Sequence, residues 1–475
     1  MSPHPAMPHP TPLNRRRLLA ASLGLGALGA LGTLLPARRA QAEDYKALVC
    51  VFLYGGNDGM NCLVPLDAER QASYQATRGA LALPSSSLLR LGTTDFGLHP
   101  SLAPLAPLHA RLAWLMNVGP LVAPLSKAEY LAANGRGPGV PGSLFSHSDQ
   151  QTLWEAGNSD LQSRSGWGGR AAQLLQLSNP VVSVGGNGRF GLSTAAVPLV
   201  LPGPGDHFGA YALQDYGWQP LIARKAALQA LYQGAGDSPL QGAFQAQQRE
   251  AFLMSDRLRE LVALEPGDAP ALAAIDAAFA PLVQNGQIAS PLGRQLYQVA
   301  KLVHGRAALP GSRQLFFAQQ GGYDTHQGQI GGTALQGTHA QLLAGLGQAV
   351  ACFDAAMQAI GMGQAVTLFT QSDFGRTFAP NASSGTDHAW GNLQFVLGGA
   401  VRGGLHGRYP TLALGGPDDV GVHDWERQGR WLPSQSVDQY AATLLRWFGA
   451  GEAQLDAVLP NLANFGSSRD LGFMG

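Results

Sequence analysis

Short apolar runs recur along the chain, and each is unbroken rather than alternating with polar residues. Unbroken runs are typical of strands that are covered on both faces, whereas alternation is typical of strands with one wet face. Six runs are therefore predicted to be buried strands: Ala47–Tyr54, Leu112–Val118, Pro180–Val184, Gln314–Ala318, Ala365–Thr370 and Leu393–Leu397.

Helical periodicity lies between these runs. In His339–Ile360, apolar residues recur every three or four positions along one face. Ser436–Phe448 is a second predicted helix, with Ser436 as its N-cap. Strands alternating with helices predict an α/β fold in which a mostly parallel sheet is sandwiched by helices. The stretch from about 202 to 310 shows helical patterns but no convincing strand, so it is predicted to be a helix-rich insertion.

The first 42 residues have the three parts of a signal peptide. The basic residues Arg15–Arg17 precede an apolar, Gly-interrupted run from Leu18 to Leu35, and Ala40–Ala42 forms a small-x-small cleavage site. We therefore expect residues 1–42 to be removed and residues 43–475 to form a single domain. The run is too short and too rich in Gly for a membrane span, and no span is expected in the mature chain.

The segment Asn14–Leu19 resembles the twin-arginine consensus, although an ordinary signal peptide rich in Arg remains an alternative. A twin-arginine leader implies export in a folded state, with the twin-arginine translocase as a partner. The mature protein is then expected to be periplasmic or secreted.

Charge and cysteine usage narrow the class of protein. Five of the 31 Lys and Arg lie in the leader, which leaves 26 basic against 31 acidic residues in the mature chain. This mildly acidic balance argues against a nucleic-acid partner. An odd number of only three cysteines is not the pattern of a disulfide-bonded scaffold. A single bridge between Cys50 and Cys62 is an alternative. Cys50 and Cys352 lie in apolar runs and are predicted to be core residues.

Acids and histidines gather in loops that lie next to the predicted strands. A single Asp in a Gly-rich loop usually only stabilises a turn. A functional site is predicted because several acids and histidines occur in such loops together. Ligands of open α/β sheets bind beyond the carboxyl ends of the strands, where several of these loops should meet. The five segments are Gly55–Asn61, Phe145–Gln151, Gly321–His326, Ser372–Thr377 and Gly385–Gly391.

Carboxylates that cluster at one sheet edge repel one another unless a cation neutralises them. Mixed Asp and His ligands suit Zn²⁺ or Mn²⁺, and carboxylates with few His suit Mg²⁺ or Ca²⁺. The pattern predicts one or two divalent ions at this edge.

These strings carry a resemblance to a known family. FLYGGNDGMN, FSHSDQQTLWEAG, GGYDTHQGQ, FTQSDFGRT and GTDHAWGN span nearly the whole mature chain. In this order they resemble the bacterial exported family called domain of unknown function 1501. That family is related to the alkaline phosphatase and sulfatase superfamily of metallohydrolases, so the resemblance implies an alkaline-phosphatase-like fold.

The resemblance also implies a two-metal site. Asp58 and Asp373 match the acids of one metal, but Phe374 stands where that site has a histidine, which puts this metal in doubt. The other metal takes an Asp, a following His and a final His. In this chain its ligands are matched by Asp324, His326 and His388, with a shorter Asp-to-His spacing than in typical phosphatases.

The nucleophile of the superfamily opens a helix, and here that place falls within Phe145–Gln151. Ser146 or Ser148 is the candidate, with His147 as a metal ligand or base. Arg376 is expected either to clamp an anionic oxygen of a small ester substrate or to form a salt bridge that fixes its loop.

The leading hypothesis is an exported metal-dependent hydrolase of phosphate or sulfate esters. The rival is an exported binding or assembly protein that keeps the fold without the chemistry. A sulfatase that uses formylglycine is disfavoured because the Cys-x-Pro-x-Arg motif is absent. The hypothesis of a hydrolase with a Ser-His-Asp triad has little support, because no Gly-x-Ser-x-Gly motif, which would carry the nucleophilic serine, follows a predicted strand.

Overall fold

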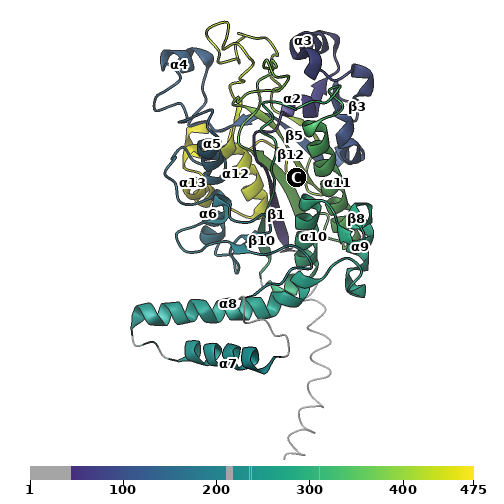
Figure 1. The fold of residues 1–475 in the computed structure, drawn as a ribbon. Coiled ribbons are helices and arrows are strands. Elements are labelled where there is room, and N and C mark those ends of the chain that lie inside the picture. The colour runs from purple at the N-terminus through teal and green to yellow at the C-terminus, as the bar shows by residue number, and fades with distance from the viewer. Residues whose placement is uncertain (1–43, 210–217, 235, 237, 310) are drawn as a thin grey trace, which may run out of the picture. The chain divides into compact units, whose positions relative to one another are not determined.

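The computed structural model describes residues 44–209, 218–234, 236, 238–309 and 311–475. The predicted signal peptide lies outside these residues. Residues 46–475 form one compact unit around a large, mostly parallel sheet with helices on both faces (Figure 1). The fold is therefore mixed α/β, as the alternation of strands and helices predicts.

The central sheet has nine strands in the order β13-β5-β12-β11-β1-β10-β6-β7, with β14 also paired to β5. All six predicted strands are present within one or two residues of the expected bounds. The strands are β1 Lys46–Leu53, β5 Leu112–Gly119, β6 Val182–Ser183, β7 Leu199–Val200, β10 Arg313–Gln320, β11 Val366–Ser372, β12 Asn392–Gly398, β13 Gly404–His406 and β14 Gln435–Ser436.

One strand of this sheet, β12, runs opposite to the others. It pairs antiparallel with both β11 and β5, while the remaining pairs of the sheet are parallel. The amino end of β12 therefore lies at the same sheet edge as the carboxyl ends of β1, β10 and β11. Residues that precede β12 are thereby placed beside residues that follow those three strands.

Helices cover the two faces of the sheet (Figure 1). On one face, α5, α6, α12 and α13 pack on a cluster that includes Phe52, Trp154, Trp167 and Phe369, all fully buried. On the other face α11 packs against α9 and α10, and α10 packs against β10. The bounds are α5 His147–Ala156, α6 Trp167–Leu174, α9 Ala273–Phe279, α10 Pro291–His304, α11 Thr338–Ala359, α12 Val437–Phe448 and α13 Glu452–Val458.

Both predicted helices are confirmed. Ser436 is the N-cap of α12, and its side chain accepts a hydrogen bond from the backbone of Gln439 in a complete capping box. Among the described residues, α11 is the one helix long and apolar enough to cross a bilayer. It packs in the core, with one face made of buried residues that include Leu343, Val350 and Phe353.

The stretch from 202 to 310 contains two kinds of helix: a pair that packs on itself, and helices that belong to the layer covering the sheet. The helices α7 (Gln219–Gln233) and α8 (Pro239–Ala263) pack on each other, as an insertion would. In contrast, α9 and α10 belong to the layer that covers the sheet. A small hairpin that the sequence does not predict, β8 Val283–Gln284 with β9 Gln287–Ile288, connects these two helices.

Shorter elements complete the fold. A second small sheet, also unpredicted, has the order β2-β4-β3. Its strands are β2 Leu63–Pro65, β3 Leu89–Arg90 and β4 Phe96–Leu98, and the remaining α-helices are α2 Gly59–Cys62, α3 Ala68–Arg78 and α4 Lys127–Ala132. The cysteines are all free and buried, so the bridge between Cys50 and Cys62 is not formed.

Candidate metal centre

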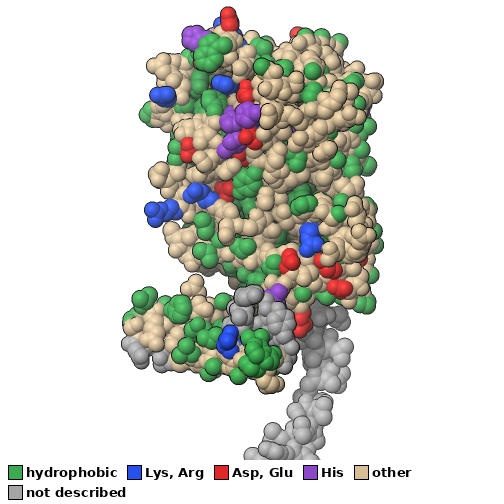
Figure 2. Space-filling view, viewed as in Figure 1, with side chains coloured by type: hydrophobic (Ala, Val, Ile, Leu, Met, Phe, Trp, Pro, Cys, Tyr) green, Lys and Arg blue, Asp and Glu red, His purple; other side chains and the backbone are tan. Residues whose placement is uncertain are grey.

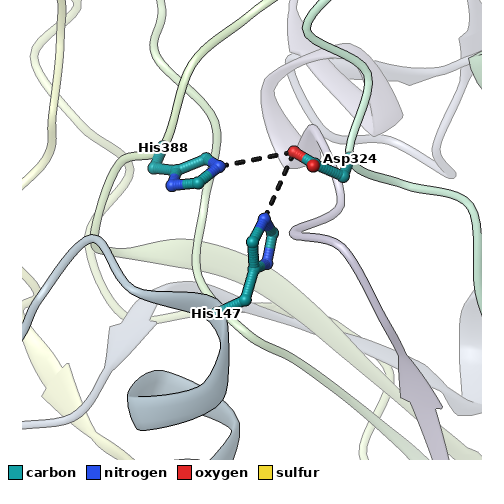
Figure 3. A group of neighbouring side chains, drawn as sticks. All are labelled: His147, Asp324 and His388. Atoms are coloured by element: carbon teal, nitrogen blue, oxygen red, sulfur yellow. Dashed lines mark hydrogen bonds and ion pairs between the residues drawn. The ribbon is translucent and has the colours of Figure 1, made fainter.

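Histidine and acidic side chains gather at one place on the surface (Figure 2). The residues come from the loops after β10 and β11, from the segment before β12, and from the first turn of α5. The reversed direction of β12 is what brings its preceding segment to this edge. His147, Asp324 and His388 point toward one another here, each from a different element (Figure 3).

The carboxylate of Asp324 is the centre of the cluster. Its Oδ1 atom lies 3.1 Å from Nε2 of His326, 3.3 Å from Nε2 of His147 and 3.4 Å from Nε2 of His388. On another side, Nη1 of Arg376 donates to the same oxygen at 2.8 Å. Three imidazole nitrogens and one guanidinium therefore converge on a single carboxylate oxygen.

The ring of His388 has a defined tautomer. Its Nδ1 lies 2.7 Å from the backbone oxygen of Phe145, which accepts hydrogen bonds only, so Nδ1 must carry a proton. Burial lowers the pKa of His388, which favours the neutral ring. The lone pair of His388 is consequently on Nε2 and faces Asp324.

The other two rings are held in the same way. Nδ1 of His147 lies 2.6 Å from Oδ2 of Asp373, and Nδ1 of His326 lies 2.7 Å from Oδ1 of Asp387. A carboxylate on the far nitrogen is the usual partner of a metal-bound histidine, because it fixes the ring and leaves Nε2 for the metal. All three rings thus present Nε2 to one place.

These groups fit a metal ion. Ligand atoms from His147, Asp324 and His388 all lie within 4.8 Å of one another. Nε2 of His147 is buried, and its neighbour is Oδ1 of Asp324 at 3.3 Å, an ion-pair distance without hydrogen-bond geometry. Nε2 of His326 is 2.9 Å from Nε2 of His388, which adds a fourth potential ligand. Three imidazoles with one carboxylate match the ligand types of Zn²⁺ and Mn²⁺ better than those of Mg²⁺ or Ca²⁺.

Charges shift the pKa values of the cluster. Burial raises the pKa of Asp324, but the hydrogen bond and the charge of Arg376 outweigh burial, so the net shift is downward. The hydrogen bond that His147 donates to Asp373 raises the pKa of His147. Burial lowers the pKa of Arg376, which is 1% exposed. Asp324 is therefore held as a carboxylate, the form that binds a cation.

Asp373 supports the cluster instead of facing it. The side chain is fully buried, and Oδ1 accepts a hydrogen bond from the backbone of Gly55 at 3.2 Å. Its Oδ2 accepts from Gln151 at 2.9 Å as well as from His147. Both oxygens are thus engaged, and the residue that the sequence places among the metal ligands orients a ligand.

The structure does not bring Asp58 into the cluster. Asp58 is 1% exposed and forms a salt bridge with Arg78, whose side chain is also buried. Oδ2 of Asp58 also accepts a hydrogen bond from Gln329 at 2.6 Å. Asp58 is therefore paired with a cation from α3 and is not part of the group that could hold an ion.

A chain of hydrogen bonds connects this buried pair to the cluster. The amide oxygen of Gln329 accepts from the hydroxyl of Thr386 at 2.6 Å, and Nε of Arg376 donates to that hydroxyl at 3.2 Å. Arg376 also donates to the backbone oxygen of Gly55. Arg376 therefore forms the salt bridge and hydrogen bonds that fix its loop, and the expected clamp on a substrate oxygen stays a prediction.

The Phe374 ring packs against two histidines of the cluster. Its ring is buried, and its centroid lies 4.7 Å from that of His147 and 4.6 Å from that of His388. At Gly56, with φ of +79°, a Cβ would lie 2.6 Å from the Phe374 ring. Among the described residues, His147, Asp324 and His388 form the one group that could hold an ion, and neither Phe374 nor Asp58 belongs to it.

The candidate nucleophiles lie at the start of α5. Ser146 is the N-cap of this helix but makes no capping hydrogen bond through its side chain. Its hydroxyl oxygen instead lies 3.3 Å from that of Ser148. Both residues flank His147, so the site brings them beside the cluster.

Comparison with protein-family models gives one match. Residues 45–426 match the model described as protein of unknown function DUF1501. The chain belongs to the DUF1501 family. No protein with a curated description matches it.

Two solved structures show a distant likeness to this DUF1501 protein. One is the crystal structure of Ps i-CgsB in complex with k-i-k-neocarrahexaose, which is 12% identical in sequence. The alignment covers 88% of this chain and 76% of that chain, with a TM-score of 0.33. The other is the crystal structure of Ps i-CgsB alone, which is 11% identical. That alignment covers 88% of this chain and 77% of the other, also with a TM-score of 0.33. Overlap at this level assigns neither activity nor ligand to the DUF1501 chain.

Sequence reasoning missed two supporting residues of this family member. Asp387 holds His326 and also accepts a hydrogen bond from Asn381 at 3.0 Å. Gln151, one turn after His147 on α5, binds the carboxylate that holds His147. The spacing of Gln151 from His147 on a predicted helix is a signal that could have indicated this role.

Proposed function

We propose that this protein is an exported, metal-dependent hydrolase of phosphate or sulfate esters with an alkaline-phosphatase-like fold. The observation that carries the proposal is the convergence of three anchored imidazoles on Asp324. We assign His147, Asp324, His326 and His388 as the residues that hold one divalent ion. A divalent ion in such a site supplies Lewis-acid polarisation of the ester and lowers the pKa of a bound water.

The surrounding residues supply the rest of the chemistry. Arg376 presents a buried cation beside Asp324, where it would hold an anionic ester oxygen. The first turn of α5 presents the hydroxyls of Ser146 and Ser148, and the positive end of the helix dipole favours negative charge there. Either hydroxyl is a candidate nucleophile toward phosphorus or sulfur.

The proposal is tested by metal content and by activity on simple esters. Protein purified without chelator should carry about one equivalent of Zn²⁺ or Mn²⁺ by mass spectrometry. The His388→Ala and Asp324→Ala variants should lose it, and His109→Ala, an exposed histidine outside the cluster, should keep it. Hydrolysis of p-nitrophenyl phosphate, bis-p-nitrophenyl phosphate or p-nitrophenyl sulfate should follow the metal content. The proposal would be refuted if the wild-type protein carried no metal and the variants hydrolysed the esters no differently from wild type.

The rival proposal is a binding or assembly protein that holds the metal for structure alone. Phe374 and the Asp58–Arg78 pair favour it, because they leave a single metal position where the related superfamily has two. Stoichiometric metal together with inactivity on all three ester classes would support this rival over the hydrolase.

We also propose export by the twin-arginine translocase to the periplasm or the medium. The support is the leader string Asn14–Leu19, followed by a weakly apolar run and Ala40–Ala42. Replacing both Arg15 and Arg16 with Lys should leave the precursor in the cytoplasm. Normal export of that variant would contradict this route.

A further inference from the structure

Two hollows share Phe145 in their linings, and the backbone oxygen of Phe145 accepts a hydrogen bond from His388 of the candidate metal centre. One has a volume of about 660 Å³ and reaches Ser146, and the other has a volume of about 400 Å³. Tyr130, Asn134 and Gly135 line both hollows together with Phe145. Volumes of this order are typical of sites for small organic ligands.

Phe145 connects the hollows to the cluster. Its backbone oxygen holds Nδ1 of His388, and the next residue but one is His147. Ser146, which lines the larger hollow, is therefore also the residue that precedes a proposed metal ligand. A molecule that fills these hollows would have one end beside the proposed metal position.

Aromatic rings supply flat apolar walls. The Arg430 guanidinium lies over the Phe145 ring at 4.8 Å, and it lines the smaller hollow. His423, also on that lining, stacks nearly parallel to Trp425, with centroids 6.2 Å apart and planes at 11°. His423 is exposed, so its ring is open to a ligand in the smaller hollow, whereas Trp425, which is 70% exposed, lines neither hollow.

Polar groups stand between these rings. Asn134, Glu426 and Arg430 line the smaller hollow. Nε of Arg430 is buried and has no hydrogen-bond partner in the described part of the chain. One of its terminal nitrogens donates to Gln428 at 3.3 Å. Arg430 therefore brings a positive charge to the lining of the smaller hollow, beside amide and carboxylate groups, although its Nε atom is closed to a ligand.

We propose that these two hollows bind the sugar part of the substrate, so that the scissile ester is a phosphate or sulfate ester on a carbohydrate. This inference rests on the proposed function. Sugar rings have apolar C–H faces that stack on aromatic side chains and hydroxyls that bond to amides, carboxylates and guanidinium groups. Arg430 would bind a second anionic group or a hydroxyl on the same sugar chain.

A nucleotide is the main competing occupant, since a base also stacks on aromatic rings. The mature chain has 26 basic against 31 acidic residues and no basic stripe, which is unfavourable for a nucleic-acid chain. The smaller hollow also carries Glu426, whose charge opposes a polyphosphate. A carbohydrate with isolated anionic groups fits this mixture better.

The test is binding to immobilised oligosaccharides that bear sulfate or phosphate groups, with their unmodified counterparts and AMP as competitors. Wild-type protein should bind at least one charged oligosaccharide, with and without EDTA, because the lining residues are not the proposed metal ligands. His423→Ala and Arg430→Gln, which change two residues on the lining of the smaller hollow, should each weaken binding by about tenfold, as expected for the loss of one stacking or charge-assisted contact. Trp218→Ala, which removes an exposed tryptophan at the start of α7, should bind as wild type does.

The outcomes separate this inference from the proposed function. Hydrolysis of p-nitrophenyl esters without binding to any oligosaccharide would overturn the inference and leave the hydrolase. Equal binding by wild type, His423→Ala and Arg430→Gln would also overturn it, as would competition by AMP alone. Oligosaccharide binding that both variants lose, in a protein without metal or activity, would support a sugar site and refute the hydrolase.

Discussion

Nε2 of His326 and Nε2 of His388 lie only 2.9 Å apart. Nδ1 of His388 donates a hydrogen bond to a backbone carbonyl, so Nε2 of His388 carries a lone pair. Nδ1 of His326 is hydrogen-bonded to the carboxylate of Asp387. Two imidazole lone pairs at this distance repel each other unless a proton or a cation lies between them. The pair thus makes a direct case for a positive charge at this point.

Removing the metal should lower the stability of the folded protein. An ion that binds the folded state alone stabilises it by about 2.7 kcal/mol when its free concentration is one hundred times Kd. Calorimetry with EDTA should therefore show a lower Tm than calorimetry with added Zn²⁺. A double variant, His326→Ala with His388→Ala, should show no difference between these two conditions.

Asp373→Asn should weaken metal binding without removing a ligand. Asn can accept a hydrogen bond from His147 but no longer supplies the negative charge that holds the ring. Loss of such a supporting carboxylate typically lowers metal affinity by about 10- to 100-fold. Competition with a chromogenic chelator measures this change. An affinity equal to that of wild type would show that Asp373 only fills space.

Arg78→Met should destabilise the fold. It leaves the carboxylate of Asp58 buried with no cation, and breaking a buried pair in this way costs about 3–5 kcal/mol. Urea unfolding measures the difference. Arg427→Met is the matched control: its partner Asp424 is 96% exposed, so the loss should be below about 1 kcal/mol. Similar losses in the two variants would contradict the buried pairing.

Asp438→Asn should stabilise the protein increasingly as the pH rises. Burial raises the pKa of Asp438 from 3.8 to about 7, although the charge of Arg170 opposes the shift. Between these values the folded state keeps a proton that the unfolded chain has lost, so the wild type loses stability as the pH rises toward 7. About three pKa units correspond to about 4 kcal/mol at most. Urea unfolding at pH 5 and pH 8 should show a larger gain for the variant at pH 8.

The sequence predicts the long strands well because burial on both faces leaves an unbroken apolar run. The cluster Leu48, Cys50 and Phe52 on one face of β1 is as buried as Val49 and Val51 on the other. The reversal of β12 could not be predicted in this way, because an apolar run has no direction. The two-residue strands of β7 and β14 are too short to show any periodicity.

The candidate site is predicted in part. Asp324, His326, His388 and His147 meet, since their loops follow or precede strands that end at one edge. Asp58 does not join them, because its partner is Arg78, twenty residues later in α3, and a motif cannot show which charge a buried acid meets. Asp373 lies close by but faces the wrong way for a ligand, which depends on hydrogen bonds from Gly55 and Gln151.

The antiparallel pairing of β11 and β12 has a consequence for how the centre is assembled. The single connection between these neighbouring strands carries Asp373, Arg376, Asp387 and His388. The connection runs from residue 373 to residue 391, between the end of β11 and the start of β12. One proposed ligand, His388, and the two carboxylates that hold His147 and His326 are therefore one contiguous piece of chain. Exchanging this one connection between relatives should change the candidate site while the sheet stays as it is.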